Sequence, residues 1–386
     1  MAPPPTATAS KRPPVKLSWD QVLAWRMHQH HLVERVPAEK VFDVTNDICL
    51  LHAQLLSSAE LSLWARIDGL EANWLENALW DERKFVKTWA MRGTLHLIPA
   101  RDYPNWQGAL NGYQHYLKPS WLRGFRVTEE EMDALLPAIS SALDGGSMLT
   151  REELAEAVVR KTDFPSLGEK LRDSWGALLK PASFQGRLCF APNRDRNAQF
   201  TTPDLWLDGY QPVPPEEGLE LMTRRYLRAF GPATREDYAR WSAHTPAAAG
   251  RMIKSLGDEV TEVEVEGYTA WMRTEDAAAA VEAGPGGTVR LVPAFDPWVI
   301  GASRSVDAQC PDAFRERVYR KQGWISPVLL VDGRMHGIWN VENKGGRTSV
   351  TIEPFTDVPA KVRKAAEAEA ARLAGFTGGR LELSWG

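Results

Sequence analysis

Cysteine is scarce in this sequence, which has three such residues in a chain of 386. Cys49, Cys189 and Cys310 lie far apart, and none has a neighbour at the short spacing of a zinc-binding pair. A cysteine-based zinc site is therefore not expected. We predict that the three residues are buried thiols.

Long apolar runs are also missing. No stretch approaches the roughly 18 residues that a membrane-spanning helix needs, and the N-terminus lacks the apolar core of a signal peptide. The hydrophobic fraction of 44% and the charged fraction of 25% are those of an ordinary globular protein. These features predict a folded, cytoplasmic protein with no membrane association.

Several catalytic signatures are absent too. The chain has no nucleophile elbow, no phosphate-binding Walker loop and no HExxH pair. His28, His30 and His31 stand close together, but their spacing is not the i, i+4 pairing of a helical zinc site, and no carboxylate or cysteine completes a set of ligands. We therefore expect neither a metal nor a cofactor.

The length of the chain predicts two to four folding units, because a single core rarely serves so many residues. The order helix, helix, β-ribbon recurs three times, and the composition turns to β near Gly286. We predict an α+β protein with three tandem winged-helix units, a C-terminal β-rich domain and one concave surface that holds the ligand. The predicted boundaries are a disordered tail at 1–15, winged-helix units at 16–127, 128–209 and 216–275, and the β-rich domain at 286–386.

Local signals support this division. Phe85 to Pro99 alternates like a hairpin, with Arg92 and Gly93 at its turn. Thr128 caps a helix that runs to Leu143, and Thr150 with Glu153 forms a capping box before the next helix. A second helix is predicted at 166–179.

The stretch from Asp47 to Arg66 carries an unusual polar pair, His52 and Gln54, between apolar residues. We predict two short helices joined by a tight turn, with Ser57 and Ser58 available to cap the second. The pair would then lie where the first helix unwinds, so that both side chains converge on one cleft. The alternative is that His52 is an ordinary packed histidine at a helix end.

Positive charge gathers in one part of a chain whose net charge is −4. Between Arg83 and Arg126 there are eight basic residues and one acid, Asp102, interleaved with seven aromatic residues from Trp89 to Phe125. This mixture is typical of a surface that meets phosphates and bases. A folded unit with an aromatic core and a solvated basic face would show the same pattern.

Five segments resemble one known family, the AlkZ-like bacterial winged-helix DNA glycosylases that release bulky alkylated bases and unhook crosslinks. The resemblance covers the chain from about Leu17 to its C-terminus. The segments are His52-Ala53-Gln54, ELSLWAR ending at Arg66, MRGTLHLIP (Met91 to Pro99), LVPAFDPWVIG (Leu291 to Gly301) and PVLLVDGRMHGIW (Pro327 to Trp339). It implies tandem winged helices, a basic DNA channel, no metal and monofunctional hydrolysis of the N-glycosidic bond.

One departure from the family pattern concerns the catalytic motif, which is usually glutamine, an aliphatic residue and glutamine. Here His52 replaces the first glutamine and Ala53 occupies the middle, as in a branch that resembles the self-resistance enzymes of organisms producing DNA-alkylating antibiotics. A guanine alkylated at N7 is already cationic, so its departure needs no general acid. Gln54 can orient a water molecule, and neutral His52, with an ordinary pKa near 6.5, can take its proton. Activity should then fall below that pH.

The expected partner is double-stranded DNA carrying alkylated bases, bound by a monomer associated with the nucleoid. The candidate DNA-binding residues are Arg92, His96, Arg304, Arg320, Lys321 and Trp324. His96 could equally be a packed strand histidine. The main alternative function is a winged-helix regulator or drug-sequestering protein that binds DNA or ligand without chemistry.

Overall fold

The computed structural model describes residues 14–386 apart from 175, 208, 302 and 304–305. The tail predicted for 1–15 therefore lies almost wholly outside the described residues, and Arg304 lies outside them as well. Val15 already begins a strand, β1 (Val15–Leu17). In the described part of the chain, no helix has both the length and the apolar character to cross a bilayer.

The first winged-helix unit contains a three-stranded sheet in the order β3-β6-β5. The predicted hairpin is confirmed, because β5 and β6 pair antiparallel on either side of the Arg92-Gly93 turn. The elements of this part of the chain are α1 (Trp19–Gln29), β2 (Val36–Pro37), α2 (Val41–Asp47), β3 (Leu51–His52), α3 (Leu56–Trp64), β4 (Ile67–Asp68), α4 (Trp74–Trp80), β5 (Phe85–Trp89), β6 (Leu95–Pro99), α5 (Tyr103–Asn111) and α6 (Pro119–Phe125).

The second unit begins with the capped helices that the sequence predicts. Thr128 and Thr150 both form capping boxes. The helix predicted at 166–179 is interrupted, however, because Gly176 has a positive φ of 83° and lies so close to Trp89 that a Cβ would come within 2.8 Å of its ring. The elements are α7 (Glu129–Leu143), β7 (Leu149–Thr150), α8 (Arg151–Lys161), α9 (Ser166–Asp173), α10 (Lys180–Phe184), β8 (Cys189–Arg194) and β9 (Asn197–Thr201).

The third unit draws one strand from the far end of the sequence. Strand β1 pairs in parallel with β10, so the sheet has the order β1-β10-β11. Helix α1 follows β1 onto this unit, where Arg26 donates a hydrogen bond to the carbonyl oxygen of Pro232 at 2.6 Å. The elements are α11 (Pro215–Phe230), α12 (Arg235–Ser242), α13 (Pro246–Ser255), β10 (Val260–Val265), β11 (Tyr268–Arg273) and α14 (Ala277–Glu282).

The C-terminal domain is a five-stranded sheet in the order β12-β13-β14-β15-β16, with α17 packed on it. Asp332 and Gly333 form the predicted hairpin turn, since both have a positive φ. The elements are β12 (Val289–Val292), α15 (Pro297–Gly301), α16 (Arg315–Val318), β13 (Val328–Val331), β14 (Arg334–Lys344), β15 (Arg347–Pro354), α17 (Ala360–Thr377) and β16 (Arg380–Trp385).

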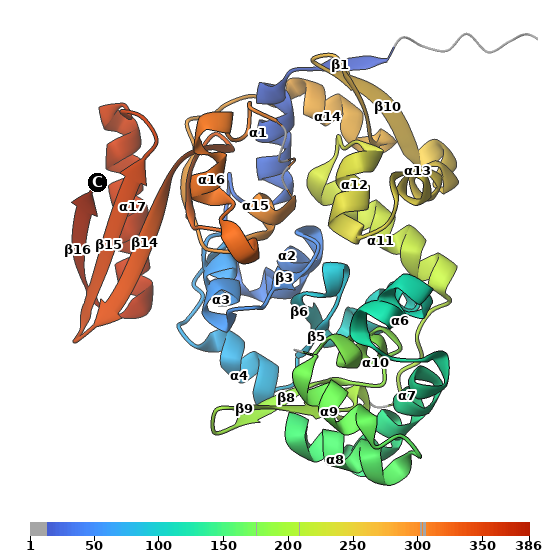
Figure 1. Cartoon of the computed structure of the whole chain (residues 1–386). Helices are drawn as coiled ribbons and strands as arrows, with labels where there is room; N and C mark the ends of the chain where they lie inside the picture. Colours follow the sequence, from blue (N-terminus) through green and yellow to red (C-terminus); the bar gives the residue numbers. More distant parts are fainter. Residues whose placement is uncertain (1–13, 175, 208, 302, 304–305) are drawn as a thin grey trace, which may run out of the picture.

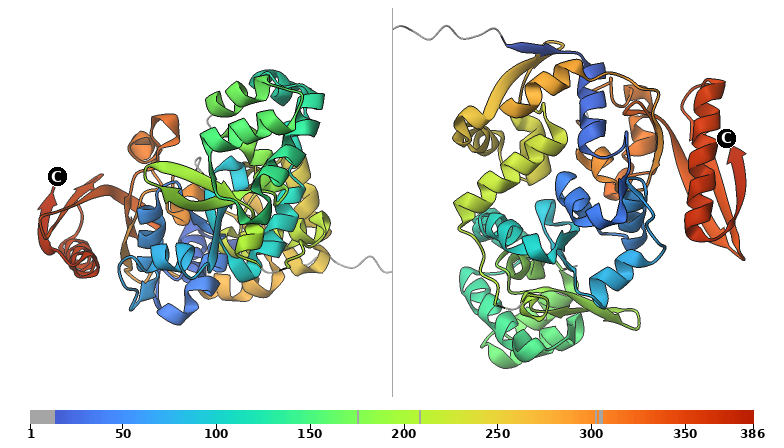
Figure 2. Two further views of the ribbon diagram at one scale, coloured as in Figure 1. Left: turned by 90° about the horizontal axis from the view of Figure 1, so that it is seen from below. Right: turned by 180° about the vertical axis from the view of Figure 1, so that it is seen from behind.

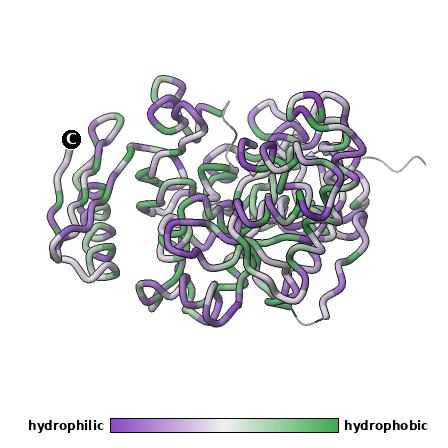
Figure 3. Tube along the Cα trace, turned by 60° about the horizontal axis from the view of Figure 1, so that its bottom comes forward, coloured by the Kyte–Doolittle hydropathy of each residue, from purple (hydrophilic) through white to green (hydrophobic). Residues whose placement is uncertain are grey.

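The sheet of the first unit lies at the centre of the molecule (Figure 1). The second and third units flank it, and α17 with β14–β16 stands at the opposite side, as the views in Figure 2 agree. Hydrophobic segments concentrate inside each part and polar segments outside (Figure 3). The three cysteines are buried, as predicted.

Two large hydrophobic cores meet at strand β3. Leu50 belongs to the core that joins the hairpin to the second and third units. Leu51, the next residue, belongs to the core that joins the first unit to the C-terminal domain. The segment that carries His52 is therefore held from both sides.

Candidate active site

The His52 segment is a strand and not a helix end, so that prediction is wrong. Helix α2 ends at Asp47, and the chain then turns through Cys49 and Leu50, whose φ angles of 58° and 77° are both left-handed. Such a conformation costs of order 1–3 kcal/mol per non-glycine residue and is kept only where the surroundings enforce it. Here both side chains are buried, and the Leu50 amide donates to the carbonyl oxygen of Thr45 at 2.8 Å.

Pairing with strand β6 fixes the direction of the His52 side chain. His52 lies opposite His96 in the ladder, and the Ala53 amide donates to the carbonyl oxygen of Leu95 at 2.8 Å. Gln54 lies at a bend just beyond β3, and it lines the same cavity as His52 without a helix end. Helix α3 then begins at Leu56 without a side-chain cap, and the predicted capping by Ser57 or Ser58 is wrong.

His52 and Gln54 line one cavity of about 640 Å³. Its walls come from β3, the β5–β6 turn, α12 and the C-terminal domain. Arg92 and Trp324, two of the predicted DNA-binding residues, also line it. The remaining lining residues are Leu55, Thr94, Arg240, Phe295, Ile300, Gln322, Gly323 and Ile325.

Three rings in successive contact, His52, Phe295 and Trp324, lead from the buried histidine to the surface, and we call them the ring ladder. The ring of Phe295 stacks on His52 with centroids 5.1 Å apart and an interplanar angle of 12°. Trp324 meets Phe295 edge-on at 5.1 Å. His52 is 7% exposed and Trp324 is 43% exposed, so the ladder connects the site with the surface.

A fully buried ion pair holds Phe295 in place. Phe295 has a φ of 57°, an unfavourable value for a bulky residue. The next residue, Asp296, accepts hydrogen bonds of 2.8 and 2.7 Å from the two terminal nitrogens of Arg66, just beyond the end of α3. Neither side chain of this pair is exposed. The pair therefore ties the loop that carries Phe295 to the helix that follows Gln54.

Burial changes the protonation of His52. Desolvation, followed by the positive charge of Arg92, lowers the pKa of His52 from 6.5 to about 4. The sequence-based expectation of an ordinary pKa near 6.5 is therefore wrong. His52 is a neutral imidazole throughout the physiological range, and it accepts a hydrogen bond without having to lose a proton first.

His96 lies behind His52 and does not line the cavity. It is 3% exposed, and its ring meets that of His52 edge-on at 5.4 Å. Its Nδ1 donates to the carbonyl oxygen of Thr94 at 3.0 Å, which fixes the tautomer. Burial, then His52 and Arg92, hold the pKa of His96 well below its usual value. The structure thus gives His96 a packing position beside His52 and no exposed surface for DNA.

The other predicted DNA-binding residues divide between two cavities. Arg92 lines the His52 cavity and also donates to the carbonyl oxygen of Trp241 at 2.6 Å, which joins the hairpin turn to α12. Arg320 and Lys321 are exposed on a tight turn that ends at Trp324, and they line a neighbouring cavity of about 700 Å³. The Arg320 amide donates to the carbonyl oxygen of Trp324 at 2.9 Å, closing the turn.

Phe295, Arg240 and Gln322 are among the lining residues that the sequence analysis did not single out. Phe295 could have been inferred from the sequence, because it belongs to the long loop FDPWVIG between predicted strands. Arg240 gave no signal, since it is one of many basic helix residues; its guanidinium binds the carbonyl oxygens of Ile300 and Gly301, both at 3.2 Å. Gln322 gave none either, because only the turn brings it to the cavity.

Tandem winged helices beside a cavity lined by a histidine and a glutamine are compatible with a winged-helix DNA glycosylase. The family model described as "DNA glycosylase AlkZ-like" matches residues 45–376. The chain belongs to this family, and it is accordingly a DNA glycosylase that acts on DNA; the regulator alternative is set aside.

Two comparisons with individual proteins agree. The chain is 35% identical over 369 residues to the "Interstrand DNA cross-link repair glycosylase" of Streptomyces sahachiroi, covering 94% of this chain and 98% of that protein. It is also similar to the solved structure of Streptomyces sahachiroi DNA glycosylase AlkZ, with a TM-score of 0.88 and 34% identity over 96% of this chain and all of that one.

Proposed function

We propose that the protein hydrolyses the N-glycosidic bond of bulky N7-alkylguanine in double-stranded DNA. The observation that carries the proposal is the placement of His52 and Gln54 side by side on one cavity, with the imidazole held neutral by burial. A cationic N7-alkylguanine is already a good leaving group, so the site need not supply an acid. What it must supply is an oriented water molecule.

In this mechanism Gln54 orients the water and His52 receives its hydrogen bond. As the bond to the base breaks, positive charge develops on the sugar, and the water becomes acidic enough for a neutral imidazole to take its proton. An imidazole with a pKa of about 4 is a weak base but remains available at every physiological pH. The reaction requires no lysine Schiff base, so the product is an intact strand with an abasic site.

DNA would approach along the basic turns at the cavity mouth. Lys321 and Arg320 are suited to phosphate contacts, and Arg92 lies deeper, where it can meet the lesion. Trp324 offers an exposed ring for stacking on a base next to the lesion. Arg304 belongs to the same proposal on the resemblance alone.

The biological role follows from the kind of lesion. The relative from Streptomyces sahachiroi is named for interstrand cross-link repair. We infer that this protein removes adducts of a DNA-alkylating natural product and so protects its host from that compound. It would act as a monomer on the nucleoid in the cytoplasm, without a cofactor or an obligate protein partner.

The test is base release from a duplex with a single N7-alkylguanine. We expect wild type to free the modified base and to leave the strand intact until alkali is added. The His52→Ala and Gln54→Ala variants should each be slower by about 10²-fold or more, the range that one positioned acid–base group contributes. His28→Ala, an exposed histidine on α1, is the matched control.

Two results would contradict the proposal. The first is a wild-type protein that releases no N7-alkylguanine under conditions where it binds the duplex. The second is release by His52→Ala and Gln54→Ala at the rate of His28→Ala.

A further inference from the structure

A second cavity of about 360 Å³ adjoins the site. This size falls within the range of roughly 300–1,000 Å³ that is typical of small-molecule pockets. We call it the aromatic pocket, after its walls. Its lining residues are Arg92, Gly93, Tyr113, His115, Trp121, Phe125, Ala177, Lys180, Pro181, Phe184 and Ala243.

The aromatic pocket and the His52 cavity share a boundary. Arg92 lines both, while the residues that follow it are divided: Gly93 lines the aromatic pocket and Thr94 lines the His52 cavity. Helix α12 repeats this division, with Arg240 on one side and Ala243, just past its end, on the other. The two cavities are therefore neighbours, and Arg92 stands between them.

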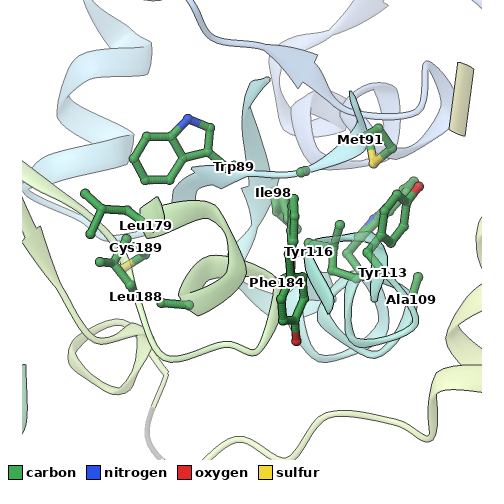
Figure 4. Packing of buried hydrophobic residues seen from close by; sticks show 14 of the residues in the cluster. Trp89, Met91, Ile98, Ala109, Tyr113, Tyr116, Leu179, Phe184, Leu188 and Cys189 are labelled. Atoms are coloured by element: carbon green, nitrogen blue, oxygen red, sulfur yellow. The ribbon is translucent and has the colours of Figure 1, made fainter. Parts of the chain in front are cut away.

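The aromatic rings of the pocket are partly buried and held by packing. Tyr113 and Phe184 are buried with centroids 5.7 Å apart, and Figure 4 shows both within one packed cluster. The Tyr113 hydroxyl donates a hydrogen bond to the carbonyl oxygen of Ser242. At the outer edge the ring centroids of Trp121 and Phe125 are 4.4 Å apart, and Phe125 is 36% exposed. Such walls favour a planar ring.

The described lining residues of the aromatic pocket include the basic residues Arg92 and Lys180 and no acidic residue. Lys180 is half-buried, and within the described part of the chain it has no ion-pair or hydrogen-bond partner. Its amine lies over the hairpin turn, because a Cβ on Gly93 would be 3.2 Å from Nζ. Burial lowers the pKa of Lys180, and no acid is among the described lining residues. A ligand with hydrogen-bond acceptors would complete this site.

We propose that the aromatic pocket binds a planar aromatic group with oxygen acceptors, carried by the adduct beyond the alkylated base. This inference rests on the proposed function. The base would lie at His52, the substituent would pass Arg92, its ring would stack against the aromatic walls and its oxygens would accept from Lys180. A backbone phosphate would also accept from Lys180, but it would have no use for the aromatic walls.

The experiment compares two lesions in the same duplex, N7-methylguanine and an N7-guanine adduct that ends in a coumarin ring. In Phe125→Ala and in Lys180→Met, we expect kcat/KM for the coumarin adduct to fall about tenfold or more, mainly through KM, as the loss of one stacking or charged contact predicts. Release of N7-methylguanine should change less than about twofold. Tyr268→Ala and Lys364→Met, both exposed and remote from the pocket, are the controls.

Three outcomes would overturn this inference. An equal fall for both lesions would make these residues general DNA contacts, such as a phosphate site at Lys180. Unchanged release of both lesions would leave the pocket without a role. If the wild type released neither base, the proposed function itself would fail, and that result is distinguishable because it appears before any substitution is made.

Discussion

Phe295→Ala tests whether the stacked ring is what keeps His52 neutral. In the folded protein the pKa of His52 is about 4 and its ordinary value is 6.5. This difference corresponds to ~3 kcal/mol against the charged imidazole, at about 1.4 kcal/mol for each pKa unit. Removal of the ring opens one face of the imidazole to a cavity of about 640 Å³. The pKa of His52 should then rise toward its ordinary value.

The pH dependence of kcat/KM measures this shift, because it reports the free enzyme. For the wild type we expect no loss attributable to His52 between about pH 8 and pH 5. If the pKa returns to 6.5, the variant is about 90% protonated near pH 5.5, so its activity there should be about tenfold below its own plateau. Loss of the buried ring also lowers the free energy of unfolding by ~3–5 kcal/mol, so the assay temperature must lie well below the midpoint of thermal unfolding.

Phe295→Leu is the matched control, since it keeps most of the buried volume and lacks the ring. Its profile should lie between those of the wild type and Phe295→Ala. Superimposable profiles for Phe295→Ala and the wild type would refute the reasoning. So would a wild-type profile that already falls tenfold near pH 5.5, because it would place the pKa of His52 at its ordinary value.

Three further predictions concern stability and DNA binding. Asp296→Asn leaves the buried guanidinium of Arg66 without its counter-charge, and the free energy of unfolding in urea should fall by ~3–5 kcal/mol. Lys321→Gln should weaken binding to all DNA sequences alike, and the slope of log K against log[salt] should become shallower by about one; an unchanged slope would remove Lys321 from the phosphate contacts. Burial lowers the pKa of His52 and His96, so below about pH 6.5 the unfolded chain binds more protons than the folded one. The free energy of unfolding should therefore be constant with respect to these two histidines above about pH 6.5. It should decrease as the pH drops to about 4, by ~3 kcal/mol for His52 alone.

Sequence-based prediction succeeded where the deciding interactions are local. Thr128 and Thr150 cap their helices through residues three positions away, and the β5–β6 hairpin depends on its own turn. Prediction failed at His52 because a two-residue strand has little preference of its own. Pairing with β6, more than forty residues later, decides its conformation.

The chemistry of the site was harder to predict than its members. His52 and Gln54 stand out in the sequence as polar residues in an apolar stretch. The pKa of His52, however, depends on burial under Phe295 and on the charge of Arg92, and neither is its neighbour in sequence. For the same reason the role of Asp296 becomes visible only with Arg66, which is 230 positions away.

The ring ladder also governs when the site comes into existence during synthesis. His52 is translated early, whereas Phe295 and Trp324 are translated near the end. A nascent chain that has emerged only through the third winged helix contains His52, Gln54 and Arg92, but it lacks Phe295, which stacks on the His52 imidazole, and the basic turn of Arg320 and Lys321. The candidate site is therefore complete only in a nearly finished chain, and partial translation products carry His52 and Gln54 without the burial that lowers the pKa of His52.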